Sequence, residues 1–254
     1  MARLLSVMSF NIWRSGGRSL DDTIEVLREI GPDVVGLQEC VADVADKIAD
    51  ALDLSCVTDE HAHAILTRGD ISRPLTTRAQ WGGLGATIDF GDGTKIHFFD
   101  AHLHWDSYGP YHLKKKTLDV AGVLAEEERM RMPGLEELFR IMDSALASPE
   151  PAFLVGDFNA PSHLDYPDIA WPTSIACEKH GLTDAFREVN RDPGITWSPI
   201  PEEEPHGAHD RIDFVHYTKG KGVVATRART IDGASARVPW PSDHRAVVVD
   251  FTVD

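Results

Sequence analysis

Hydrophobic residues in the first fifty positions recur with two different spacings. The predicted order is β-α-β-α, with strands over residues 4–10 and 34–37 and helices over residues 20–30 and 41–52. Ser19 has the side chain of a helix N-cap, and Gly31-Pro32 is a stop signal for the first helix. Short apolar runs alternating with amphipathic helices indicate strands that are buried on both faces.

After residue 52 the pattern changes to short strands, a hairpin and two long helices. The predicted strands are 64–66, 84–90, 95–101, 152–155, 211–217, 223–231 and 245–251, and the predicted helices are 113–130 and 135–146. Gly91-Asp92-Gly93 is a hairpin signal, and residues 199–209 predict an exposed loop. Hairpins mixed with helices favour an α/β (α+β) fold with stacked sheets and outer helices over one parallel sheet. Because no linker divides the chain, we expect one domain over residues 1–254.

Charge and composition narrow the class of protein. The net charge of −16 repels polyanions and argues against tight binding of long nucleic acid, although a basic groove or a bound metal ion would change the local field. Cys40, Cys56 and Cys177 lack the even number of a disulfide framework and the spacing of a zinc site. No apolar run is long enough to span a bilayer, and no cleavage site follows the strand-like amino terminus. We therefore expect a cytoplasmic protein without membrane insertion, and the sequence leaves its oligomeric state open.

Polar residues with metal or proton chemistry lie where the predicted strands begin or end. They are Asn11, Glu39, His102, Asp157, Asn159, Asp213, Asp243 and His244. Strand ends hold side chains at the rim of a rigid sheet, where a site keeps a fixed geometry. Each residue also has a structural interpretation by itself, but their repetition predicts one polar site at the sheet rims.

Glu39 and Asn11 are both oxygen donors, and oxygen is the ligand that Mg²⁺ prefers. The structural alternative for Glu39 is a first-turn carboxylate of the following helix, and for Asn11 it is a turn residue after a strand. In Gly156-Asp157-Phe158-Asn159, an acceptor able to orient water and a donor able to hold a phosphate oxygen lie two positions apart. An Asx-type turn is the alternative there.

Asp213 and His244 form a candidate carboxylate–imidazole pair, in which the carboxylate fixes the tautomer of the ring and favours its charged form. Ser242 is then a turn residue. A serine hydrolase would need a strained Gly-x-Ser-x-Gly turn, and the sequence has none.

Taken in order, these segments resemble the endonuclease/exonuclease/phosphatase superfamily from Val7 to Phe251. The matching motifs are Asn11, Leu37-Gln38-Glu39, His63-Ala64-Ile65-Leu66-Thr67-Arg68, Asp100-Ala101-His102-Leu103, Gly156-Asp157-Phe158-Asn159, Arg211-Ile212-Asp213-Phe214 and Ser242-Asp243-His244. The resemblance implies a four-layer α/β/β/α sandwich with two packed mixed β-sheets and a site at one end. It also implies Mg²⁺ or Mn²⁺, with Glu39 as principal ligand and Asn11 and Asp243 nearby.

The resemblance further implies roles for the other site residues. His102 would contact the scissile phosphate or protonate the leaving group, and Asp157 would orient or activate the attacking water. Asn159 would hold the phosphate, and His244, paired with Asp213, would stabilise its developing charge. The resemblance leaves open which group takes the proton.

Departures from the family pattern bear on the substrate. Where inositol polyphosphate 5-phosphatases have Pro-Ala-Trp-Cys-Asp-Arg, this chain has His209-Asp210-Arg211-Ile212-Asp213, which argues against that subgroup. The stretch from His102 to Asp106 resembles poly(A)-tail deadenylases. His63 stands where the family usually has glycine. We interpret His104, His209 and Arg211 as candidate substrate-binding residues, because each is close in sequence to a core motif.

Other groups near these motifs have both a functional and a structural interpretation. Trp105, Tyr108 and Tyr111 are able to stack on a base or sugar, or to pack under a loop. Lys114-Lys115-Lys116 would meet a substrate phosphate or lie solvated at the start of a helix. Glu202-Glu203-Glu204 would repel a phosphate backbone if it borders the cleft, or would be a solvated loop.

The sequence thus predicts a divalent-metal-dependent hydrolase of phosphate esters that acts by direct water attack at phosphorus. Phosphodiesters, with nucleic acid or a nucleotide among the candidate substrates, are slightly favoured. A phosphomonoesterase acting on a sugar or lipid headgroup would share the core residues and differ in its loops. A catalytically inactive phosphate-binding module is the alternative from another class, and the intact set of site residues argues against it.

Overall fold

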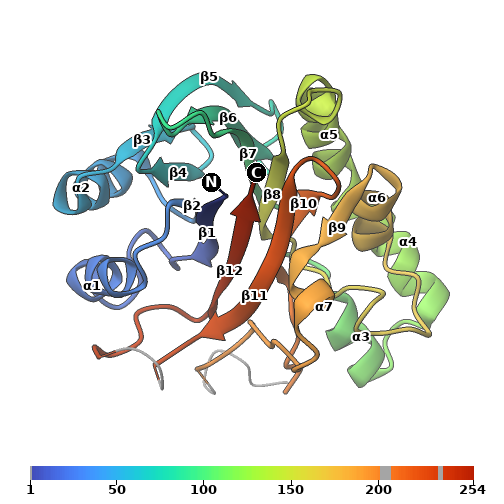
Figure 1. Ribbon diagram of the computed structural model, residues 1–254. Helices are drawn as coiled ribbons and strands as arrows, with labels where there is room; N and C mark the ends of the chain where they lie inside the picture. Colours follow the sequence, from blue (N-terminus) through green and yellow to red (C-terminus); the bar gives the residue numbers. More distant parts are fainter. Residues whose placement is uncertain (1, 201–206, 234–236) are drawn as a thin grey trace.

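Two six-stranded β-sheets pack face to face in the centre of the protein (Figure 1). The computed structural model describes residues 2–200, 207–233 and 237–254. The first sheet has the order β11-β12-β1-β2-β4-β3, with β1 (Arg3–Asn11), β2 (Val34–Gln38), β3 (Ser55–Thr58), β4 (Ala64–Thr67), β11 (Val223–Ile231) and β12 (Ala246–Val253). The second has the order β5-β6-β7-β8-β10-β9, with β5 (Asp70–Thr76), β6 (Gly83–Asp89), β7 (Lys95–His102), β8 (Ala152–Asp157), β9 (Leu182–Asp184) and β10 (Asp213–Thr218).

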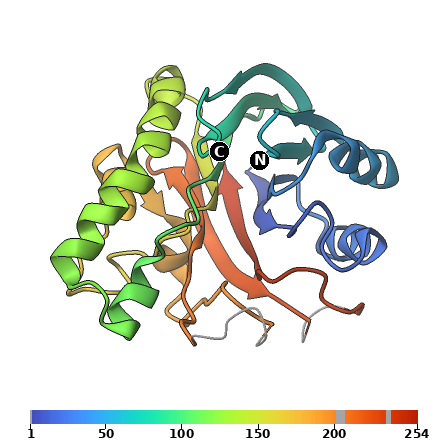
Figure 2. The same ribbon diagram turned by 180° about the vertical axis from the view of Figure 1, so that it is seen from behind.

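Helices cover the outer face of each sheet. The helices of the described residues are α1 (Leu20–Ile30), α2 (Ala42–Leu52), α3 (Gly109–Lys115), α4 (Val120–Met130), α5 (Met132–Leu146), α6 (Pro172–Lys179) and α7 (Ala185–Val189), and the last of these packs at the edge of the core between the sheets. In both views, α1 and α2 lie on one side of the sheets, and α4 and α5 lie on the opposite side (Figures 1 and 2). This arrangement confirms the predicted four-layer α/β/β/α sandwich with two mixed sheets.

Side chains along β1 alternate between two apolar cores, one on each face of the first sheet. Leu5 and Val7 point into the core between the two sheets, whereas Met8 and Phe10 point into the core beneath α1 and α2. A third core lies between the second sheet and α5, where Leu138 packs among its members. Because both faces of the strands are covered, the buried strands show as apolar runs in the sequence.

The helix limits agree with the predictions at one place and differ at another. Ser19 caps α1 as predicted, since its hydroxyl accepts a hydrogen bond from the Asp22 amide at 3.2 Å. The single helix predicted over residues 113–130 is wrong. Lys116 ends α3 in a left-handed conformation, and Asp119 begins α4 as its N-cap. Lys114-Lys115-Lys116 therefore ends a helix instead of starting one.

Several short elements were not predicted at all. They are β3, β5, β9, α6 and α7. β5 is an edge strand whose residues are mostly exposed, so it carries little apolar periodicity. The predicted strand over 211–217 begins only at Asp213. Glu202-Glu203-Glu204 lies outside the described residues. Among the residues that are described, no helix combines the length and apolarity that crossing a membrane requires.

Each sheet contains one parallel strand pair, and the carboxyl ends of these pairs carry the candidate site residues. In the first sheet β1 runs parallel to β2, with Asn11 opposite Gln38. In the second sheet β7 runs parallel to β8, with His102 opposite Asp157. Asp213, at the start of β10, pairs antiparallel with Asp157. The fold therefore brings chemistry-bearing side chains of both sheets to the same rim.

Behind this rim the two sheets approach closely around Gly36. A methyl group at Gly36 would lie 2.5 Å from Val155 Cγ2 and 2.6 Å from Asp100 Oδ1. Gln38 Nε2 donates a hydrogen bond across the interface to Asp100 Oδ1 at 2.5 Å. Burial raises the pKa of the Asp100 carboxyl well above its ordinary value and so favours the neutral form of this carboxyl in the folded protein.

A buried acid with a raised pKa makes stability depend on pH. The unfolded Asp100 ionises above its ordinary pKa of 3.8 while the folded one stays protonated, so its contribution to stability is lost as pH rises towards the folded pKa. Asp100→Asn keeps a neutral isostere and removes this loss. We expect the difference in free energy of unfolding between the variant and the wild type to grow, in favour of the variant, by up to about 1.4 kcal/mol per pH unit above pH ~4. Urea denaturation at pH 5 and 8 measures it, and a difference that does not change with pH contradicts the account.

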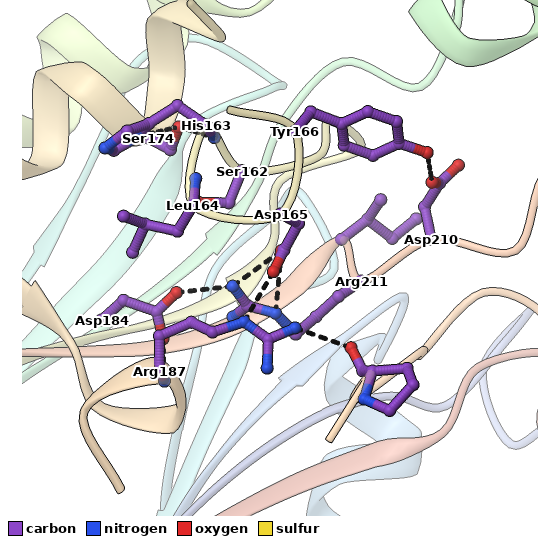
Figure 3. Close-up of polar contacts among 12 residues, drawn as sticks. Ser162, His163, Leu164, Asp165, Tyr166, Ser174, Asp184, Arg187, Asp210 and Arg211 are labelled. Carbon is purple, nitrogen blue, oxygen red and sulfur yellow. Dashed lines mark hydrogen bonds and ion pairs between the residues drawn. The ribbon is translucent and has the colours of Figure 1, made fainter. Parts of the chain in front are cut away.

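Arg211 is buried in an ion-pair network with residues of β9, α7 and the segment between β8 and α6 (Figure 3). Its Nη2 donates to Asp165 Oδ2 at 2.8 Å and to Asp184 Oδ2 at 2.7 Å. Asp165 also accepts from Arg187 Nε at 2.6 Å. Nearby, Asp210 accepts hydrogen bonds from the hydroxyls of Tyr108 and Tyr166. The network fixes the segments that precede β10.

We expect Arg211→Ala to destabilise the protein by about 3–5 kcal/mol, because it leaves buried carboxylates without their cation. The catalytic rate per folded molecule should change little, since the guanidinium is held away from the rim. Urea denaturation and initial rates with and without a stabilising osmolyte separate the two effects. A stable variant with a strongly raised KM would contradict this account and support Arg211 as a substrate-binding residue.

Candidate functional site

A cavity of about 520 Å³ opens at the rim where the two sheets meet. Its lining residues are Trp13, Arg14, Ser15, Glu39, His61, Ala62, Gln80, Trp81, His102, Trp105, Asp157, Asn159, Trp197, Asp243 and His244. Six of the eight polar residues predicted at the strand ends are in this set, and the other two, Asn11 and Asp213, contact members of it. Residues from positions 11 to 244 thus meet at one place.

Asn11 joins carboxylates that follow strands of different sheets. Its Nδ2 donates to Glu39 Oε1 at 3.3 Å and to Asp157 Oδ2 at 3.0 Å, while its Oδ1 accepts from the Trp13 amide at 2.9 Å. Glu39 Oε2 accepts from the Arg14 amide at 2.7 Å. Burial acts to raise the pKa of Glu39, but the hydrogen bonds and the nearby imidazoles outweigh it and lower the pKa. Glu39 is therefore a fixed carboxylate.

The backbone around these carboxylates is held in an unusual conformation. Trp13, Arg14 and Ser15 have φ values of 55°, 50° and 61°, and Glu39 and Asn159 have φ values of 57° and 50°. Each such non-glycine residue costs of the order of 1 kcal/mol, and such costs concentrate at functional sites. Here the conformation turns the amides of Arg14 and Ser15 toward the side chain and the carbonyl of Glu39.

His244 lies between two carboxylates. Its Nδ1 is 2.9 Å from Asp213 Oδ2, and its Nε2 is 3.6 Å from Asp157 Oδ2. Burial acts to lower the pKa of His244, but Asp213 and Asp157 outweigh it and raise the pKa well above its ordinary value. The ring is therefore an imidazolium at neutral pH, with a positive charge fixed at the rim.

His102 and Asp157 have the opposite electrostatic character. Burial lowers the pKa of His102 despite the nearby carboxylates of Asp157 and Glu39, so this ring is neutral. Burial and the charge of Asp213 raise the pKa of Asp157, whereas the two imidazoles lower it. Asp157 Oδ1 accepts from the Asn159 amide at 2.9 Å. The cavity thus holds one neutral and one charged imidazole on either side of a carboxylate.

Asp243 is the least satisfied carboxylate of the site. Its Oδ1 is buried and has no hydrogen-bond partner among the described residues. Burial, together with the charges of Glu39 and Asp157, raises the pKa of Asp243 to about 7. Crowded carboxylates of this kind are relieved by a cation, and an oxygen-only donor set suits Mg²⁺ or Mn²⁺. Glu39 and Asp243 therefore fit a divalent ion.

A second group of possible ligands lies deeper. Asp157, Asp213 and His244 have donor atoms within 4.8 Å of one another. Metal ligation needs a neutral imidazole, but His244 has a raised pKa and its Nδ1 is already engaged by Asp213. All three side chains are buried. The contacts within this group are those of an ion-paired chain.

Asn159 and Ser242 shape the cavity in different ways. Asn159 Nδ2 donates to the Leu103 carbonyl at 3.0 Å, which orients the amide and leaves one N–H at the cavity. Ser242 is fully buried, donates to the Asn11 carbonyl at 2.6 Å and accepts from the His244 amide at 3.0 Å. Ser242 is thus a turn residue that ties β1 to the segment before β12.

Three candidate substrate-binding residues lie outside the cavity. The Arg211 guanidinium is buried with Asp165 and Asp184, so it has no contact with the cavity. His209 is exposed and lines a separate hollow with Tyr166. His104 is not among the lining residues, and its ring centroid lies 5.1 Å from that of the lining residue Trp81. Proximity in sequence to a core motif was the reason for choosing them, but it does not by itself place a side chain in the cavity.

Sequence reasoning missed most of the cavity wall. Trp13, Trp81, Trp197 and His61 line the cavity, yet none follows a predicted strand in a recognisable motif. Trp197 packs against the His244 ring at 4.9 Å and pairs through its backbone with Asp210. The one usable signal was Trp13, only two residues after Asn11.

Comparison with known proteins agrees with this arrangement. The chain is 35% identical to the uncharacterized protein F14F9.5 of Caenorhabditis elegans over 289 residues, covering 98% of this chain and 91% of that protein. The structure is similar to an endonuclease/exonuclease/phosphatase family protein from Bacteroides thetaiotaomicron, with a TM-score of 0.67 and 17% identity, covering 100% of this chain and 99% of that chain. It is also similar to truncated TDP2 of C. elegans, with a TM-score of 0.62 and 19% identity, covering 98% of this chain and 97% of that chain.

At these identities the solved structures establish the shared fold alone. The family itself is established by sequence, because the model of the Endonuclease/Exonuclease/phosphatase family matches residues 8–244, a range that includes all the residues lining the cavity. The chain therefore belongs to the endonuclease/exonuclease/phosphatase family.

Proposed function

We propose that residues 1–254 form one catalytic domain that hydrolyses phosphate esters with the help of Mg²⁺ or Mn²⁺, phosphodiesters being slightly favoured. Membership of the family supports a phosphoesterase. The observation that carries the proposal is the Asn11 amide, which holds Glu39 and Asp157 side by side at an open cavity. A purely structural carboxylate pair would not be kept together at a solvent-reachable rim.

Three groups supply the phosphate-binding part of the proposed site. The free N–H of the Asn159 amide and the neutral ring of His102 each offer a hydrogen-bond donor to a phosphate oxygen. The His244 imidazolium supplies a positive charge held in place by Asp213. Donors and charge already in position stabilise the negative charge that grows in the transition state.

Asp157 is the proposed acceptor that orients the attacking water. Its Oδ2 receives the Asn11 amide and lies 3.7 Å from His102 Nε2 and 3.6 Å from His244 Nε2. In the proposed step a water oxygen bonds to phosphorus, the P–O bond to the ester group breaks, and the proton released by the water ends on the leaving oxygen.

Glu39 and Asp243 would hold the divalent ion, with Asn11 positioning Glu39. When bound, such an ion supplies positive charge that polarises the phosphate and offsets its charge. In this structure Asn11 turns its Nδ2, not its oxygen, toward the carboxylates, so we propose Asn11 as a positioning residue for the metal ligands.

We expect Asp157→Asn to lower the hydrolysis rate by at least ~100-fold, because the amide neither accepts a proton nor orients water as a carboxylate does. The assay is release of nitrophenol from bis(p-nitrophenyl) phosphate with Mn²⁺. Asp43→Asn, at an exposed carboxylate of α2, is the matched control and should keep the wild-type rate. Circular dichroism checks that the variant is folded. A folded Asp157→Asn protein with wild-type turnover would sink the assignment.

Glu39→Gln should raise the Mn²⁺ concentration for half-maximal activity by roughly tenfold or more, because one negative charge leaves the proposed donor set. Glutamine still accepts the hydrogen bond from the Arg14 amide, so the loop should keep its conformation. Glu60→Gln is the control, since the Glu60 side chain is 88% exposed. Calorimetric titration with Mn²⁺ gives the same comparison without turnover. Identical titration curves for the variant and wild type would contradict the assignment of Glu39 as ligand.

A further inference from the structure

Tryptophan is concentrated around the cavity. Four of its lining residues are Trp13, Trp81, Trp105 and Trp197. Trp105 is 59% exposed, the second highest exposed fraction among the large hydrophobic residues that lie at the surface, after Leu4. Leaving an indole ring in water at the mouth of a polar site costs hydrophobic free energy that a bound ligand recovers. Trp105 is therefore a candidate for ligand contact.

Three aromatic rings near the cavity form a series of ring–ring contacts that begins at His102. Trp81 lies edge-on to His102 with ring centroids 5.2 Å apart, and the Trp81 and His104 centroids are 5.1 Å apart. His104 then stacks on Trp105 at 6.4 Å with an interplanar angle of 28°. Burial lowers the pKa of His104, so its ring is neutral. We call Trp81, His104 and Trp105 the aromatic wall.

The scaffold holds the aromatic wall in place. At Gly134 in α5 the backbone approaches the Trp81 loop so closely that a methyl group would lie 1.7 Å from the Trp81 carbonyl oxygen. Gly82, the next residue, accepts a backbone hydrogen bond from His102 at 3.0 Å. Arg131 Nη2 donates to the Asp106 carbonyl at 3.2 Å, directly after Trp105. A ligand would meet a wall that is already positioned, which lowers the entropy lost on binding.

Charge around the cavity limits how many phosphates it accepts. Among the described residues that line it, Arg14 alone is a lysine or arginine. The whole chain has a net charge of −16. A protein that follows a nucleic-acid backbone neutralises several phosphates with several such cations. One arginine, one imidazolium and one divalent ion match a single phosphate group.

We infer that the preferred substrate is a small phosphoester that carries one phosphate and a flat aromatic group, and that the aromatic wall binds this group. The inference rests on the proposed function, because it takes the phosphate to lie beside His102. Since the Trp81 ring is 5.2 Å from the His102 ring, an aromatic ring stacked on the wall lies within a few bonds of that phosphate. Aryl phosphates and nucleoside phosphates share this chemistry.

Two phosphonates of equal charge test the wall without turnover. Benzylphosphonate carries a flat ring, and cyclohexylmethylphosphonate carries a saturated ring of similar size. Binding to the Mn²⁺-loaded protein is measured by calorimetry and by quenching of tryptophan fluorescence. We expect the aromatic ligand to bind about tenfold more tightly, in line with the strength of stacking on an aromatic side chain. Equal affinities, or tighter binding of the saturated ring, overturn the inference, because plain apolar contact would give that result.

Two variants test whether the aromatic wall causes the preference for the aromatic ligand. Trp105→Leu keeps an apolar side chain at an exposed position and should reduce the affinity ratio of the two ligands to about one. Trp13→Leu changes a lining tryptophan outside the wall and should leave the ratio unchanged. A ratio lost in Trp13→Leu but kept in Trp105→Leu assigns ring binding to the wrong side of the cavity and overturns the proposal.

An oligonucleotide arm tests the limit of one phosphate and separates the two sources of aromatic ligand. Thymidine 5′-phosphate and a ten-nucleotide oligothymidylate compete with benzylphosphonate at two salt concentrations. We expect the affinity of the oligomer, per molecule, to exceed that of the mononucleotide by no more than about threefold. An oligomer that binds far more tightly and loses affinity steeply with salt overturns the limit. Absence of hydrolysis with every phosphoester would refute the proposed function instead, while the phosphonate ratio still reports on the wall.

Discussion

The candidate site depends on one amide that spans two β-sheets. Asn11 ends β1 in the first sheet, and its Nδ2 reaches Glu39 at 3.3 Å and Asp157 in the second sheet at 3.0 Å. A second link, between Asp213 and His244, crosses the same gap at 2.9 Å. Both links require the sheets to keep their relative position, which the close approach at Gly36 enforces. The packing of the core and the geometry of the site are therefore one constraint.

The backbone conformations and the crowded carboxylates of the rim cost free energy of folding. Catalytic sites share this property. Consecutive left-handed residues from Trp13 to Ser15, and Glu39 and Asn159, carry local strain. Crowding with neighbouring carboxylates adds to burial in raising the pKa of Asp243 to about 7. These costs are offset by the rest of the fold, and a cation would relieve the electrostatic part. Strain and charge concentrated at one open cavity favour a functional origin over a structural one.

Local signals predicted most of the fold, and long-range contacts account for what they missed. The cap at Ser19 and the buried strands were readable because capping and apolar runs depend on neighbouring residues. The candidate site residues could be predicted because the ends of strands and the order of the motifs are visible in the sequence. The ion pair of Arg211 with Asp165 was not predicted, since the two residues lie 46 positions apart and no local sequence signal indicates the pairing. The break at Lys116 and the wall around Trp81 depend in the same way on tertiary contacts.

The central claim is that a divalent ion sits at the carboxylates of the open rim and serves phosphoester hydrolysis there. Anomalous diffraction from crystals soaked in Mn²⁺ tests it most directly. The account predicts an anomalous peak within bonding distance of a Glu39 carboxylate oxygen, with Asp243 beside it, and no peak in crystals of the Glu39→Gln variant at the same Mn²⁺ concentration. A peak between Asp157, Asp213 and His244, or none at the rim, would contradict it.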